Sequence, residues 1–257
     1  MAYQAVFKRF ELKYLLTLAQ KEQILRAMEP YMALDQYGRT TIRNVYLDTD
    51  NYRLIRRSIE KPAYKEKIRL RSYRRAGEGT DIFVELKKKC KGVVFKRRLT
   101  LKEDLALAWA AGVRPEGQTS QIADEIDYFI RFYGTVKPAV YLCYDREAYF
   151  SKDGSDFRIT FDDTILCRRT DMTLDSDPYG TPILPEDMVL MEVKCAGGIP
   201  LWLTKVLTEE HIYKTSFSKY GTAYETLIYP NLKEETIHGS IVQGSVRFRS
   251  YHRHQCR

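Results

Sequence analysis

Cysteine and histidine, which build disulfides, zinc sites and many nucleophilic triads, are scarce among the 257 residues of this chain. The five cysteines are odd in number, widely spaced and without a CxxC pair, so a disulfide framework or a zinc site is not expected. The four histidines show no triad-like spacing. No stretch approaches the ~20 consecutive apolar residues of a membrane helix, and no apolar signal core precedes the first charges. We therefore expect a cytoplasmic protein with no membrane segment in this chain.

Charge is abundant in the sequence. Lys and Arg number 42 against 34 Asp and Glu, which gives a formal net charge of +8. Such an excess suggests an anionic partner: nucleic acid, anionic lipid or a phosphorylated small molecule. No helix-turn-helix, zinc-finger or RNP signature is present, so we do not expect nucleic acid. Because repeats and linkers are lacking too, we expect a single domain over residues 1–232 and a flexible basic tail over residues 233–257.

Hydrophobic periodicity predicts about eight strands with irregularly placed helices. The strands are expected at residues 6–15, 41–48, 65–74, 81–89, 93–101, 138–150, 157–167 and 188–196. Thr17 and Gln20 have the spacing of a capping box at a helix start, and Asp50 is expected to cap a short helix that ends near Arg57. Further helices are expected at residues 103–111, 120–133, 201–209 and 218–228. This order disfavours a doubly wound parallel sheet and favours an antiparallel α+β protein or a closed barrel.

Cations gather on one face of several predicted strands. Lys67, Arg69 and Arg71 share a face, opposite Ile68 and Leu70, because successive strand side chains point to opposite sides. Other strands have the same alternation in Arg9/Glu11/Lys13, Glu85/Lys87/Lys89, Lys96/Arg98, Arg158/Thr160/Asp162 and Glu192/Lys194. A one-sided sheet with a solvated polar face would explain any single strand. Like charges two residues apart repel unless an anion lies between them, so a barrel that encloses a polyanion is the second interpretation.

Eight short motifs along the chain resemble a known superfamily. In order they are KRFELKY, KIRLRSY, FVELKKK, VFKRRL, YDREAY, FRITFD, MEVK and FSKYG. Together they resemble the triphosphate tunnel metalloenzymes, and within these the VTC domain, the polyphosphate polymerase module of the vacuolar transporter chaperone complex. The resemblance extends from about Phe7 to Ile228. It implies an α+β fold, a closed eight-stranded antiparallel β-barrel with helices packed outside, in a free-standing prokaryotic-type enzyme. We expect a monomer or weak oligomer.

The resemblance also implies roles for individual residues. The cations that would grip phosphates are Lys13, Arg69, Arg71, Lys87, Lys96, Arg146, Arg158 and Lys219. Further substrate contacts would come from Tyr144, Lys194, Ser218 and Arg57, where Arg56 competes with Arg57 for the same position. Glu192, together with Glu11, would hold Mn²⁺ or Mg²⁺, since both metals favour carboxylate and phosphate oxygens.

The implied activity is transfer of the terminal phosphoryl group of ATP to a growing inorganic polyphosphate chain. Phosphoryl transfer requires positioning and charge neutralisation and no covalent enzyme intermediate. The first strand has Arg9-x-Glu11-x-Lys13, where the hydrolytic and cyclase-like members of the superfamily have Glu-x-Glu-x-Lys. With one carboxylate fewer, the chain has less capacity for a second metal ion and for activating water. A tripolyphosphatase of the same fold and a non-enzymatic polyphosphate sensor remain alternatives.

Overall fold

A computed structural model describes residues 10–77, 79–91 and 93–232, and within them eleven strands form one antiparallel sheet. The strands are β1 (Phe10–Thr17), β2 (Met32–Leu34), β3 (Thr40–Asp48), β4 (Tyr64–Ser72), β5 (Asp81–Cys90), β6 (Val93–Lys102), β7 (Lys137–Ser151), β8 (Arg158–Arg168), β9 (Thr181–Pro182), β10 (Met188–Cys195) and β11 (Lys214–Thr215). The helices are α1 (Leu18–Met28), α2 (Arg53–Ile59), α3 (Glu103–Ala110), α4 (Gln121–Tyr133), α5 (Leu201–Glu209) and α6 (Lys219–Ala223), and a π-helix, η1 (Tyr224–Ile228), follows α6 directly.

The eight predicted strands are all present. The structure also contains three short strands that the sequence did not predict, β2, β9 and β11. The predicted C-terminal tail lies outside the described residues, and the division into one domain and a tail stays a prediction.

The sheet is not closed, so the expectation of a closed eight-stranded barrel is wrong. Its hydrogen-bonded order is β11-β1-β10-β8-β7-β3-β4-β5-β6, with β2 beside β7 and β9 beside β8. The short strand β11 pairs with β1 at Lys13 and Tyr14, which makes this edge of β1 unavailable to β6. The sheet still curls strongly, since Lys87 Nζ on β5 lies 3.0 Å from Glu11 Oε2 on β1, although five strands lie between β1 and β5 in the sheet.

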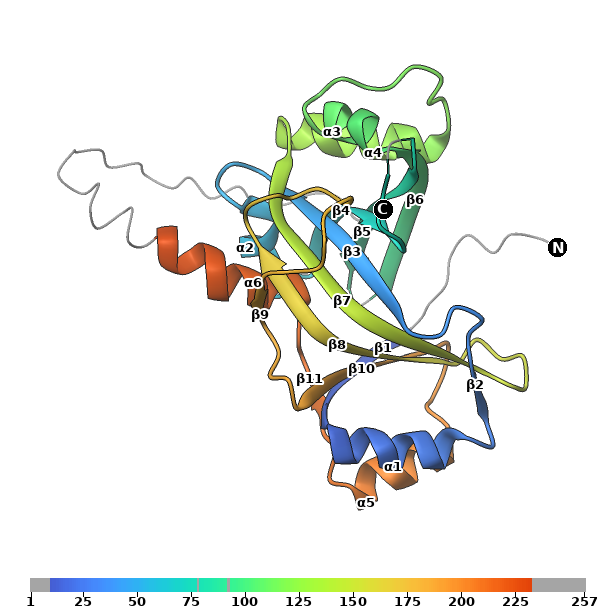
Figure 1. Cartoon of the computed structure of the whole chain (residues 1–257). Helices are drawn as coiled ribbons and strands as arrows, with labels where there is room; N and C mark the ends of the chain where they lie inside the picture. Colours follow the sequence, from blue (N-terminus) through green and yellow to red (C-terminus); the bar gives the residue numbers. More distant parts are fainter. Residues whose placement is uncertain (1–9, 78, 92, 233–257) are drawn as a thin grey trace.

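Helices cover the outer face of the curled sheet in two groups at opposite ends of the molecule (Figure 1). At one end α3 and α4 pack on the sheet, with Trp109 in the same core as Ile68 of β4. At the other end α1 and α5 place Ile24 and Leu203 against Phe161 of β8. The apolar members of the alternating strands therefore point outward beneath the helices, and the polar members point inward.

The segment formed by α6 and η1 packs against the inner face. Tyr220, Tyr224 and Ile228 share a core with Tyr46 and Leu142, and the rings of Tyr46 and Tyr220 stack with their centroids 4.6 Å apart. This apolar packing fills one part of the inner face, and polar side chains occupy the rest.

The start of α1 follows the predicted local chemistry. Gln20 N donates to Thr17 Oγ1 at 3.2 Å, and Thr17 N donates to Gln20 Oε1 at 3.0 Å, so the capping box is confirmed. Both contacts lie within four residues of sequence, which is why the spacing alone predicts them.

The start of α2 differs from the prediction. Asp50 does not cap the helix, because the cap position is Tyr52, which makes no side-chain cap bond. The carboxylate of Asp48, the last residue of β3, accepts hydrogen bonds from Leu54 N at 2.9 Å and Ile55 N at 3.0 Å. A buried carboxylate thus satisfies two of the free N–H groups at the helix start, which ties α2 to the sheet.

Candidate functional site

The polar side chains of the inner face form one charged group, which we call the inner polar cluster. β4 contributes three of its members because Ile68 and Leu70 between them are buried under the outer helices. The cations are Lys13, Lys67, Arg69, Arg71, Lys87, Lys96, Arg98, Arg146, Lys194 and Lys219, and the carboxylates are Glu11, Glu85, Asp162 and Glu192. Ten cations against four carboxylates leave a positive excess that a bound anion would balance.

Glu85 on β5 is the centre of one half of the cluster. Its side chain is 2% exposed, and its oxygens lie 2.7 Å from Arg69 Nη2 and 2.7 Å from Lys96 Nζ. Arg98 Nε lies 2.8 Å away and Arg71 Nε 3.8 Å away. Burial alone would raise the pKa of Glu85, but Arg69 and Arg71 outweigh it and hold that pKa far below its usual range. Burial lowers the pKa of Lys96 to about 8 despite its contact with Glu85, because guanidinium groups share the same carboxylate.

Asp162 and Glu192 are the centre of the other half. Arg146 forms a bidentate ion pair with Asp162, with distances of 2.6 Å from Nε to Oδ1 and 2.7 Å from Nη2 to Oδ2. Lys219 Nζ contacts Asp162 and lies 3.3 Å from Glu192 Oε1, and Lys13 Nζ lies 3.1 Å from the same oxygen. Burial would raise the pKa of Glu192, but Lys219 and Lys13 hold it well below its usual range. Burial would raise the pKa of Asp162 as well, but Arg146 and Lys219 lower it, so both carboxylates are ionised at neutral pH.

An ion pair joins β1 to β5 across the inner face. Lys87 Nζ lies 3.0 Å from Glu11 Oε2, and Lys13 Nζ lies 3.7 Å from Glu11 Oε1. Burial would raise the pKa of Glu11, but the positive charges of Lys87 and Lys13 outweigh burial and lower this pKa to about 2. Glu11 is thus ionised as well.

Tyr144 on β7 connects the two halves. Its hydroxyl accepts from Arg71 Nη2 at 3.0 Å, while Arg71 Nε donates to Asn44 Oδ1 at 2.9 Å. The charged groups of Arg146 and Lys219 lie over its ring, at 5.1 Å and 4.5 Å from the centroid. These contacts fix the side chains that would meet a ligand.

The structure brings most of the predicted site residues together. Those within the inner polar cluster or in contact with it are Glu11, Lys13, Arg69, Arg71, Lys87, Lys96, Tyr144, Arg146, Glu192, Lys194, Ser218 and Lys219. Ser218 is the N-cap of α6. Burial lowers the pKa of Lys194 to about 8, although its Nζ is 3.9 Å from Glu192.

Two predicted residues make no ion pair with the cluster within the described part of the chain. Arg158, the first residue of β8, is opposite Lys194 in register and therefore on the inner face, but it is exposed at the strand end. Arg57 is exposed on α2, and its charge acts on Tyr133 of α4, a helix of the outer face. The roles of both residues stay predictions.

Lys67, Glu85, Arg98 and Asp162 are missing from the predicted site residues, although strand alternation places each of them on a charged face. Asp162 is fully buried against Arg146, because the register of β7 and β8 sets the two residues opposite each other. That register joins distant parts of the chain, so strand alternation alone does not reveal the pair.

The carboxylates suit a metal ion that is bound together with phosphate. Nowhere in the described ranges do three or more acidic, His or Cys side chains group so that they could hold a metal by themselves. Glu11 and Glu192 do converge, since the ammonium group of Lys13 contacts both. Mg²⁺ and Mn²⁺ are commonly held by one or two carboxylates, with substrate phosphates and water as the remaining ligands. Glu11 and Glu192 fit that pattern.

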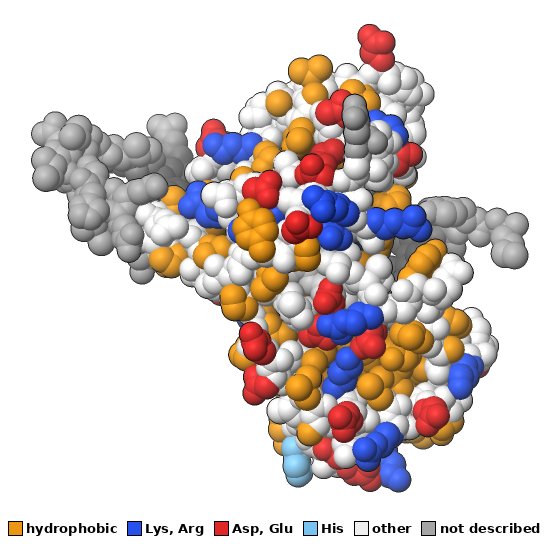
Figure 2. Space-filling model, in the orientation of Figure 1, with side chains coloured by type: hydrophobic (Ala, Val, Ile, Leu, Met, Phe, Trp, Pro, Cys, Tyr) orange, Lys and Arg blue, Asp and Glu red, His pale blue; other side chains and the backbone are white. Residues whose placement is uncertain are grey.

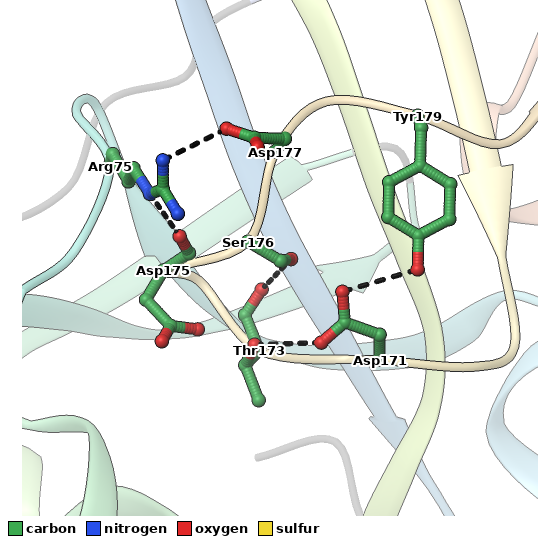
Figure 3. A pocket seen from close by; sticks show the side chains of 7 residues that line it. All are labelled: Arg75, Asp171, Thr173, Asp175, Ser176, Asp177 and Tyr179. Atoms are coloured by element: carbon green, nitrogen blue, oxygen red, sulfur yellow. Dashed lines mark hydrogen bonds and ion pairs between the residues drawn. The ribbon is translucent and has the colours of Figure 1, made fainter.

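A hollow of about 500 Å³ lies in the loop between β8 and β9 (Figure 3). Tyr179 OH donates to Asp171 at 3.2 Å, and Arg75 Nη1 lies 3.0 Å from Asp177. Beside the loop, the guanidinium group of Arg168 lies 4.0 Å from the centre of the Tyr179 ring. These polar groups hold the loop together, and none of them belongs to the inner polar cluster.

On the molecular face shown in Figure 2, Lys and Arg side chains are interspersed with Asp and Glu, and no single basic patch stands out. Hydrophobic side chains gather in the lower part of this view, where Figure 1 places α1 and α5. None of the helices in the described part of the chain is long and apolar enough to cross a membrane.

The fold and the cluster define an α+β protein whose curled antiparallel sheet holds a cationic interior. The chain belongs to the VTC domain family, whose sequence profile matches residues 8–228. None of the curated proteins matches it.

Several solved structures are similar in fold. A candidate adenylate cyclase from Bacillus halodurans is 13% identical, with a TM-score of 0.44 over 96% of this chain and 97% of that one. The PH1819 protein from Pyrococcus horikoshii OT3 is 15% identical, with a TM-score of 0.43 over 88% and 98%. A candidate adenylyl cyclase from Hippeastrum, described as having a dominant triphosphatase activity, is 15% identical, with a TM-score of 0.48 over 84% and 94%. All three TM-scores are below 0.5, so none of these structures bears on the function of this chain.

Proposed function

We propose that the protein is a polyphosphate polymerase, which transfers the terminal phosphoryl group of ATP to the end of an inorganic polyphosphate chain bound along the inner polar cluster. The observation that carries the proposal is the excess of ten cations over four carboxylates on one inner face. A polyphosphate chain is a long, flexible anion with about one charge per phosphate, so it could balance this excess along its length.

The reaction breaks the bond between the γ-phosphorus of ATP and its bridging oxygen, and the electron pair leaves with ADP. A terminal oxygen of the polyphosphate chain forms the new bond to that phosphorus. Arg69 and Arg71 on one wall and Arg146 on the other would align the two phosphate groups and neutralise charge on the oxygens. The nucleophile is already an oxyanion, so no side chain has to remove a proton from it.

The state of the carboxylates favours transfer to phosphate over attack by water. A general base is most effective when its pKa lies near the working pH. Cations instead hold the pKa of Glu11 at about 2 and that of Glu192 well below its usual range. These groups suit a Mn²⁺ or Mg²⁺ ion, which when bound would neutralise phosphate charge.

The test is incubation of the purified protein with ATP and Mn²⁺, followed by electrophoresis for polyphosphate and measurement of ADP. We expect long polyphosphate together with ADP. Release of free phosphate alone would show a triphosphate hydrolase, and binding without turnover would show a polyphosphate sensor, so either result would refute the polymerase.

Substitution of two inner arginines tests the site directly. Arg69→Ala combined with Arg71→Ala should abolish synthesis, because two guanidinium groups that would align phosphates are lost. Arg26→Ala is the matched control, since Arg26 on α1 is 72% exposed. Circular dichroism should show that all variants keep the fold, and an active double variant would show that the inner face is not the active site.

A further inference from the structure

Lys67 on β4 differs from the other cations of the inner polar cluster. The other nine each lie within 4.0 Å of a carboxylate. Lys67 Nζ has Ser218 Oγ at 3.1 Å, and no ion pair joins it to an acidic side chain of residues 10–77, 79–91 or 93–232. A partly buried ammonium without a counter-ion is unfavourable unless a ligand supplies the charge.

The neighbours of Lys67 make the local charge more positive. Lys87 lies directly opposite it in the register of β4 and β5. The groups around its ammonium are Lys65 and Arg69 on β4, Lys87 on β5, Lys13 on β1, and Ser218 and the ring of Tyr220 from the α6 segment. Tyr220 adds no negative charge, because burial and Asp48 raise the pKa of its phenol well above the usual value. An anion at this point would therefore meet cations from three strands.

Lys67 and Ser218 also have hydrogen-bond donors that no described residue accepts. Ser218 Oγ accepts from Lys67 Nζ and, at 3.2 Å, from Gly221 N. Its own O–H has no acceptor among the described residues, and the ammonium of Lys67 uses one of its three donors. Adjacent donors that lack an acceptor are what an anionic phosphate oxygen satisfies.

We propose that Lys67 and Ser218, with Lys87 opposite, bind one phosphate group of the polyphosphate chain. The proposal rests on the proposed function and adds Lys67 to its binding residues. Bound phosphate supplies the counter-ion that Lys67 lacks in the free protein, so it stabilises the charged form of this lysine. Binding is therefore coupled to protonation of Lys67.

The coupling has a definite pH range. Burial, followed by the charge of Lys13, lowers the pKa of Lys67 to about 7. A bound anion raises that pKa, so at pH 8 the lysine takes up close to one proton on binding, whereas at pH 6 it is already charged and takes up little.

The test is isothermal titration calorimetry, which measures the dissociation constant of tripolyphosphate for the full chain. EDTA is present to prevent metal-dependent turnover. Lys67→Met should weaken binding about tenfold or more at pH 7, since a charge-assisted contact is lost. Lys67→Arg keeps the charge and should bind within a few-fold of the wild type. Lys205→Met is the matched control, because Lys205 on α5 is 75% exposed, and it should bind like the wild type.

Titration at pH 8 in two buffers of different ionisation enthalpy gives the proton uptake. The wild type should take up close to one proton more than Lys67→Arg, because arginine stays charged at this pH and the contribution of tripolyphosphate itself cancels. At pH 6 this difference should disappear.

The outcomes separate the two proposals. Binding by Lys67→Met within twofold of the wild type, or equal proton uptake by the wild type and Lys67→Arg at pH 8, would overturn the role of Lys67. If tripolyphosphate binding depends on Lys67 but ATP gives no polyphosphate, only the polymerase proposal fails. If the wild type does not bind tripolyphosphate, both fail.

Discussion

Glu85 offers the sharpest test of the charge balance in the inner polar cluster. Glu85→Gln keeps the shape of the side chain but removes the charge that Arg69, Arg71, Lys96 and Arg98 share. Breaking a buried ion pair by removing one partner costs about 3–5 kcal/mol. Arg98 and Lys96 are 34% and 44% exposed, so water screens part of the loss and we expect a decrease of about 2–4 kcal/mol in the free energy of unfolding.

A polyanion should reverse this loss. If phosphate groups bind the cations that Glu85 holds in the free protein, tripolyphosphate should stabilise Glu85→Gln more than the wild type. A ligand at 100 times its dissociation constant stabilises a protein by about 2.7 kcal/mol, and tighter binding by the variant adds to this value. The assay is urea unfolding followed by circular dichroism, with and without tripolyphosphate.

Glu125→Gln is the matched control for this experiment. Glu125 on α4 holds Arg97 at 3.0 Å and Lys88 at 3.4 Å on the outer side of the sheet, so its loss should lower stability without changing the response to tripolyphosphate. Equal stabilisation of the wild type and Glu85→Gln by tripolyphosphate would refute the reasoning, and so would a loss of stability below about 1 kcal/mol.

The stability that Glu85 contributes should decrease at low pH. Cations hold the pKa of Glu85 far below its usual range in the folded protein, so its stabilising effect is complete above the unfolded pKa of about 4.3 and decreases as the pH falls below it. The difference in stability between the wild type and Glu85→Gln should shrink as the pH falls below about 4.

Two further substitutions separate metal binding from stability. Glu192→Gln should raise the Mn²⁺ concentration needed for half-maximal ATP turnover, because one of two converging carboxylates loses its charge, and an unchanged Mn²⁺ titration would argue against this role. Thr17→Ala should lower the free energy of unfolding by about 1 kcal/mol through loss of the cap of α1, with unchanged ATP turnover. Lower turnover at full occupancy of the folded state would show that the cap matters beyond stability.

Local signals account for the parts of the fold that the sequence predicts correctly. Strand alternation around Arg69 and the capping box at Thr17 each depend on residues close in sequence, and the structure has both. Asp50 fails as a cap because Asp48, buried at the end of β3, reaches the same helix. Sequence spacing favoured the residue nearer to the helix, whereas the direction of the chain as it leaves the strand decided which carboxylate points at it.

Contacts between distant segments explain what the sequence does not predict. The pairing of Lys214–Thr215 with β1 involves only two residues, which leave no periodic pattern, yet it occupies the edge that a closed barrel would need. The pairs of Glu85 with Arg98 and of Asp162 with Arg146 depend on strand register. Alternation predicts that such residues share a face, but it does not predict which charges touch.

The contact between β1 and β5, here called the seam, is formed by the ion pair of Glu11 and Lys87. It affects how a long polymer could reach the interior of the sheet. A closed barrel would require a chain to enter end-on, and the α6 segment fills part of the inner face with apolar side chains. Across the described strands the two walls meet here through Glu11 and Lys87, whose side chains are 23% and 43% exposed. Both side chains are partly exposed, so water screens this ion pair. If the seam parts along this contact, a bound polyanion can enter and leave sideways, so its length need not be limited by threading.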